Sequence, residues 1–151
     1  MDNARQLCTF FVDDLLLSIE VERVQEVLRP QEMTRVPLAS EVVSGLINLR
    51  GQIVTAVCLR RRLLLPDPPE GWKPMNIVVR AEGGPVALLV DEIGDVLEVE
   101  DAAFERPPET LHGPAREMIR GVYKLKERLM MVLDADKAIA LPTAAERSSA
   151  A

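Results

Sequence analysis

Few side chains in this 151-residue sequence have the types and spacing that catalysis requires. The single histidine, His112, lies in the loop-like segment "LHGPAR", without a cysteine or a carboxylate pair nearby in sequence to complete a metal site. Ser18 and Ser44 lack the Gly-x-Ser-x-Gly frame that presents an activated nucleophile. Gly83-Gly84 lacks the spacing of phosphate-binding loops and is typical of a hairpin turn. We therefore expect no catalytic centre, no cofactor and no metal site.

Two charged groups leave alternatives open. Asp91, Glu92 and Asp95 have oxygen atoms suited to a hard cation or to a shared proton, as a divalent-metal enzyme would need. Their spacing does not match a calcium loop, which favours a solvated strand end. The run Arg60 to Arg62 has the donors to bind a phosphate or an acidic protein. On an acidic chain, we expect these arginines to form a solvated helix face.

Composition and charge narrow the classes of partner. The formal charge is −6, which disfavours nucleic acid and anionic lipid as partners. The N-terminal "MDNARQL" lacks the features of a secretion signal, and the apolar runs are too short to span a membrane. Cys8 and Cys58 lie far apart in apolar segments and are predicted to be buried reduced thiols. These features predict a cytoplasmic protein without direct membrane insertion.

The apolar segments are short and rich in Val, Ile and Leu, which favours strands over helices. Nine or ten strands are expected, among them hairpins around Asp13-Asp14, Arg50-Gly51 and Lys126-Glu127. Crossover helices are missing, so an all-β sandwich or a pair of small barrels fits the pattern. Short helical segments are predicted at 40–43, after Cys58, and after an Asp134 cap.

Five blocks together resemble the CheW family of bacterial chemotaxis coupling proteins: "RVQEVL", "TRVP", "SGLINLRGQIVTAVCLR", "VALLVDEIGDVLEV" and "IRGVYKLKERLMMVLD". The resemblance implies two small five-stranded SH3-like β-barrels that share an apolar seam, with no enzymatic activity. We place this CheW-like domain at 5–142, with the junction between the barrels in the proline-rich stretch near 66–76, and expect a flexible tail at 143–151.

The same resemblance implies an adaptor that holds the regulatory domain of a CheA-type histidine kinase against the cytoplasmic tips of chemoreceptors. An alternative is a module of the same fold that binds the kinase without receptor contact. Positions that match the family's partner-binding segments are Val24, Glu26, Gly45, Asn48, Arg50 and Gly51. Val90 and Asp91 match a second motif, which we interpret as structural.

Two interpretations of Arg50 stay open. Its guanidinium could tie the turn to backbone carbonyls or to Glu26, or it could be presented to a partner as a rigid charged donor, with Gly45 leaving the backbone open to close approach. Val24 could fill the core or form an exposed anchor. Thr55 and Cys58 depart from the Pro and Asp of many relatives, and Cys58 is a poor helix cap.

Overall fold

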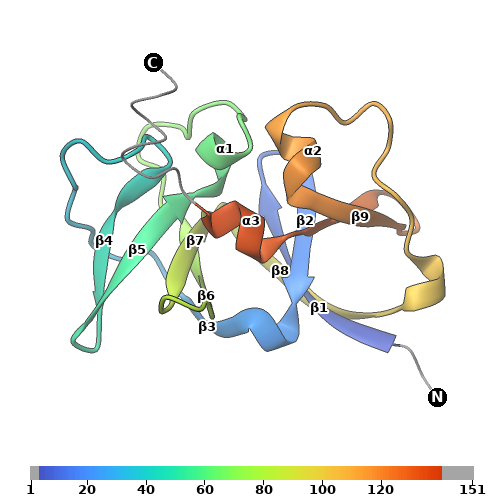
Figure 1. Ribbon diagram of the computed structural model, residues 1–151, viewed down its shortest axis with the longest axis horizontal. Helices are drawn as coiled ribbons and strands as arrows, with labels where there is room; N and C mark the ends of the chain where they lie inside the picture. The colour runs from blue at the N-terminus through green and yellow to red at the C-terminus, as the bar shows by residue number, and fades with distance from the viewer. Residues whose placement is uncertain (1–3, 141–151) are drawn as a thin grey trace.

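The structure is a computed structural model that describes residues 4–140, and ten strands with short helical turns make up most of it (Figure 1). In chain order the elements are β1 Ala4–Val12, β2 Leu15–Glu20, the 3-10 turn η1 Val21–Arg23, β3 Val24–Leu28, β4 Val43–Leu49, β5 Gln52–Cys58, α1 Leu59–Arg62, β6 Met75–Val79, β7 Val86–Val90, β8 Glu92–Glu100, the 3-10 turn η2 Asp101–Ala103, α2 Pro114–Met118, β9 Ile119–Lys124, β10 Leu129–Leu133 and α3 Ala135–Ile139.

The strands form two five-stranded sheets, which confirms the predicted all-β class with short helices. Sheet A has the order β8-β1-β2-β10-β9, and sheet B has the order β3-β6-β7-β5-β4. The predicted hairpins β1–β2, β4–β5, β6–β7 and β9–β10 all pair antiparallel. Each sheet also contains one parallel pair, β10 with β2 and β5 with β7.

The two sheets repeat one arrangement. In each, the segment that follows one edge strand reaches the opposite edge strand and pairs with it at one residue. In sheet B the segment after β3 pairs through Thr34 with Leu46 of β4, and in sheet A the segment after β8 pairs through Glu105 with Val122 of β9. A glycine precedes the bridged residue in both. A Cβ on Gly45 would lie 2.7 Å from the Thr34 carbonyl oxygen, and one on Gly121 would overlap the Phe104 ring. A side chain at either position would therefore push the crossing segment away from the sheet.

One apolar core spans both sheets. Phe10 and Leu17 of sheet A and Ile77 and Leu88 of sheet B belong to the same cluster, and each is fully buried. A smaller cluster fills sheet B, and another fills sheet A. Burial of apolar surface contributes roughly 25 cal/mol per Å², so the shared cluster joins the sheets strongly. This is the predicted apolar seam.

The predicted junction near 66–76 is wrong. Strands β6 and β7 follow that segment, yet they lie in the same sheet as β3, β4 and β5. The chain passes between the sheets at η1 and again at Asp91, between β7 and β8. Proline density marks a stiff connection in sequence, but strand pairing decides which sheet a segment joins. The tail expected at 143–151 lies outside the described residues.

The other local predictions have mixed outcomes. Asp134 caps α3 by accepting a hydrogen bond from the Lys137 amide at 3.1 Å, as predicted. Cys8 and Cys58 are buried and free, also as predicted. The helical turn expected at 40–43 is wrong: Ser40 accepts from the Val43 amide in a turn, and β4 then runs through Gly45. Gly45 pairs with Ala56 of β5, and the next residue, Leu46, also bridges Thr34, so this segment lies in the sheet.

Candidate partner-binding surfaces

The turn between β4 and β5 is built by three of the predicted site residues. Arg50 and Gly51 have positive φ angles of 52° and 88°, the combination that a two-residue hairpin turn with the primed geometry requires. The Asn48 side-chain oxygen accepts a hydrogen bond from the Gly51 amide at 2.8 Å. The turn is thus held by its own residues and projects its side chains in a fixed direction.

Arg50 forms an ion pair with Glu26 of β3, as one of the two interpretations required. The Arg50 side chain nevertheless remains 68% exposed, whereas that of Glu26 is 23% exposed. A guanidinium has five donor hydrogens, and the single contact with Glu26 leaves most of this group facing solvent. Arg50 therefore bonds to Glu26 within the chain, and its charged guanidinium is still exposed to solvent.

We define the turn patch as Glu26, Asn48, Arg50 and Gly51 together with one exposed apolar residue, Ile53. Ile53 is 62% exposed and pairs with Asn48 across the hairpin. Sequence reasoning missed Ile53. The sequence did contain a signal for Ile53. Side chains along a strand point alternately to opposite faces, so Ile53 must face away from the core that buries Val54.

Val24 and Gly45 do not belong to the turn patch. Val24 is half-buried and packs against the shared core, which favours the core-filling interpretation. Gly45 is buried, and the backbone that approaches it closely is the chain's own Thr34. The expectation that Gly45 leaves its backbone open to a partner is therefore wrong.

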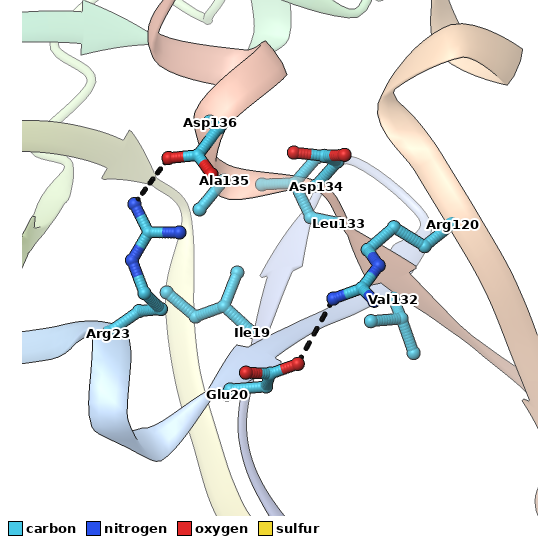
Figure 2. A pocket seen from close by; sticks show the side chains of 9 residues that line it. All are labelled: Ile19, Glu20, Arg23, Arg120, Val132, Leu133, Asp134, Ala135 and Asp136. Atoms are coloured by element: carbon cyan, nitrogen blue, oxygen red, sulfur yellow. Dashed lines mark hydrogen bonds and ion pairs between the residues drawn. The ribbon is translucent and has the colours of Figure 1, made fainter. Parts of the chain in front are cut away.

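A second surface feature is a hollow of about 290 Å³ between η1, the end of β10 and the start of α3 (Figure 2). Two ion pairs flank it: Arg23 with Asp136 at 2.8 Å, and Arg120 with Glu20 at 3.0 Å. Ile19 and Val132 line it between them. We call this the seam hollow, because η1, where the chain leaves sheet A, forms one of its walls. Arg23 and Asp136 are 113 residues apart, so no local sequence signal connects them.

The arginines of α1 were predicted to face solvent, and for Arg60 this is wrong. Its side chain is 11% exposed, and it donates to both carboxylate oxygens of Asp91, at 3.0 and 2.7 Å. Asp91 also accepts from the Trp72 indole at 2.9 Å and from the Asp13 amide at 2.6 Å. Asp91 is thus the centre of a structural network, as its motif suggested, and the interpretation of a solvated strand end is wrong for it.

The network changes the acidity of Asp91. Burial raises the pKa of this carboxyl, but the hydrogen bonds from Arg60, Asp13 and Trp72 outweigh burial, so the pKa lies below its usual value. Arg60 has a raised pKa, chiefly because of its hydrogen bond to Asp91. Both groups are therefore charged at neutral pH.

Within residues 4–140, no three His, Cys, Asp or Glu side chains gather in a way that would hold a metal ion. The same part of the chain has no helix with the length and apolar character needed to cross a membrane.

The fold and the two surface features define an all-β protein of two fused five-stranded sheets. The family model for the CheW-like domain matches residues 6–142. The chain is 30% identical over 131 residues to the chemotaxis protein CheW of Bacillus subtilis (strain 168), covering 87% of this chain and 84% of that protein. It is 26% identical over 140 residues to chemotaxis protein CheW of Treponema pallidum (strain Nichols), covering 90% and 82%.

A solved structure has the same fold. The scaffolding protein TtCheW from Thermoanaerobacter tengcongensis superimposes with a TM-score of 0.77 at 22% identity, over 88% of this chain and 89% of that one. The chain belongs to the CheW-like domain family.

Proposed function

We propose that this protein is a non-enzymatic adaptor of bacterial chemotaxis, which couples the cytoplasmic tips of chemoreceptors to a CheA-type histidine kinase. The observation that supports the proposal most directly is the presence of two separate surface features on one body with a shared core. Family membership supports the pathway. The charged residues at the junction between the sheets are engaged in structural ion pairs, which fits a protein that binds rather than catalyses.

The turn patch suits the regulatory domain of the kinase. An apolar centre inside a polar rim is the usual anatomy of a protein–protein interface. Ile53 supplies the exposed apolar area, and Arg50 supplies a charged donor beside it. Arginine is among the residues that contribute most to binding when an interface covers them.

The seam hollow suits the receptor tip. A helical hairpin binds by inserting side chains from one face of a helix into a groove, and about 290 Å³ provides room for one or two such side chains. The lining is mainly charged, so it would receive a polar or charged side chain, and Arg23 and Arg120 at the rim would pair with carboxylates of the partner.

The test is a binding measurement with purified partners, a kinase regulatory domain and a receptor tip fragment, each alone and both together. We expect Ile53→Asp to weaken kinase binding while receptor binding is retained, and Arg120→Ala to do the reverse. Kinase binding without receptor binding, in the unmodified chain, would favour the alternative of a kinase-regulating module. Retention of neither partner would refute the adaptor.

A further inference from the structure

Arg62 lies on α1 of sheet B but bonds to α3, which follows sheet A in the chain. Its Nε donates to the Ala138 carbonyl at 3.1 Å, and its Nη2 donates to the carbonyls of Lys137 at 2.9 Å and Ala140 at 2.8 Å. The last carbonyls of a helix have no partners within the helix. Arg62 therefore supplies, from the other sheet, the cap that the carboxyl end of α3 needs.

The opposite end of α3 lines the seam hollow. Ala135 and Asp136 belong to both the helix and the hollow, and Asp136 pairs with Arg23 (Figure 2). A helix of five residues is too short to be stable alone. Its position depends on its contacts, and because it spans little more than one turn, its two ends must move together.

The position of α3 depends on two kinds of contact. Ala135 and Ala138 are buried in the shared core and Ile139 packs against its edge, so apolar contact holds α3 there without fixing its direction. Arg62 adds directional bonds, and burial lowers the pKa of its guanidinium from the usual value. In Figure 1, α3 lies between the two sheets, near β5 and β7 on one side and β2 on the other.

We propose that Arg62 is a positioning residue for the seam hollow: by holding the carboxyl end of α3 against α1, it fixes where Ala135 and Asp136 stand relative to Arg23. The consequence for receptor binding rests on the proposed function, since that function assigns the hollow to the receptor tip. The effect of Arg62 on the shape of the hollow is independent of the proposed function.

The neighbouring arginine provides a matched control. Arg61 lies on the same helical turn, but it donates to the Glu41 carbonyl at 3.2 Å and pairs with Asp67 at 3.4 Å, both of which precede β6 in the part of the chain that builds sheet B. Arg61→Gln and Arg62→Gln remove the same charge from the same helix. Only the second removes bonds to α3.

The experiment records amide NMR spectra of the full chain and of Arg61→Gln, Arg62→Gln and Arg62→Lys without any partner, then titrates a receptor tip fragment and a kinase regulatory domain. We expect Arg62→Gln to shift the signals of Asp134 to Asp136 and of Arg23, and to weaken receptor binding about fivefold to tenfold, a common size for coupling between sites. Arg62→Lys should give shifts and a loss of affinity between those of the unmodified chain and of Arg62→Gln. Arg61→Gln should leave the signals of the hollow and receptor binding unchanged.

The outcomes separate the two proposals. Shifts in Arg62→Gln that are confined to α1 and to the three residues whose carbonyls Arg62 contacts, Lys137, Ala138 and Ala140, with the signals of the hollow unchanged, would overturn the positioning role. If the hollow signals move as expected while receptor affinity stays constant, Arg62 has the positioning role and the assignment of the hollow to the receptor fails. If Arg62→Gln does not fold, Arg62→Lys carries the comparison, because it retains the charge and loses the forked geometry.

Discussion

Arg60 and Asp91 form a two-point ion pair, with Nε to Oδ1 at 3.0 Å and Nη2 to Oδ2 at 2.7 Å, that bonds α1 of sheet B to the link where the chain crosses into sheet A. The Asp13 amide, in the β1–β2 turn of sheet A, donates to the same carboxylate. One side chain thus connects three segments that are distant in sequence.

Asp91→Asn should reduce the free energy of unfolding by about 3 kcal/mol, because breaking a largely buried ion pair leaves Arg60 charged without its partner. Arg60→Met alone should reduce the free energy of unfolding by a similar amount. The double variant Arg60→Met, Asp91→Asn should be clearly more stable than the sum of the two losses predicts. Urea unfolding of all four proteins measures the coupling, and simple additivity would show that the pair contributes nothing specific.

The pair should also give the fold an acid-dependent stability. Since the pKa of Asp91 is lowered in the folded protein, its carboxylate stabilises the fold above the unfolded pKa of about 3.9, and this contribution disappears as pH falls through the folded value. Unfolding free energy measured between pH 5 and pH 2.5, a range chosen around that value of about 3.9, should fall less steeply in Asp91→Asn. Identical slopes would contradict the lowered pKa.

Gly45→Ala should destabilise the protein by about 1 to 3 kcal/mol, because the new methyl group would meet the Thr34 carbonyl oxygen at 2.7 Å and displace the bridge to Leu46. Gly83→Ala is the control, since a Cβ there meets nothing within 4 Å. Thermal unfolding of the two variants compares the sites. Equal melting temperatures would mean that the crossing segment moves without cost.

Arg50→Ala should leave thermal unfolding nearly unchanged, because exposed ion pairs such as the one with Glu26 contribute only about 0.2 to 1 kcal/mol. Assembly of the chain with receptor fragment and kinase should nonetheless weaken. Sedimentation of the mixture and a melting curve provide the two readings. A large loss of melting temperature that parallels the loss of assembly would assign Arg50 a mainly structural role.

The strands were predictable because alternation and turn chemistry are local properties. The β5 boundaries, the Asp134 cap and the turn at Arg50-Gly51 could all be predicted from neighbouring residues. The contact of Arg50 with Glu26 was part of one of the two interpretations that the sequence left open, and it is present.

The connections between the sheets were not predictable in the same way. Arg60 and Arg62 have identical chemistry and lie two positions apart, yet one bonds to Asp91 and the other to α3. Nothing local distinguishes an arginine that meets a buried carboxylate from one that faces solvent. The seam hollow could not be predicted for the same reason, since Glu20 and Arg120, which form an ion pair beside it, are 100 residues apart in the sequence.

The order of strands in the two sheets bears on how the chain folds. Sheet B is built from one continuous stretch, β3 to β7, whereas sheet A needs β1 and β2 from before that stretch and β8 to β10 from after it. Contacts that close long loops form slowly. During synthesis, the hairpin of β1 and β2 should therefore keep its apolar face exposed until β8 to β10 have been made.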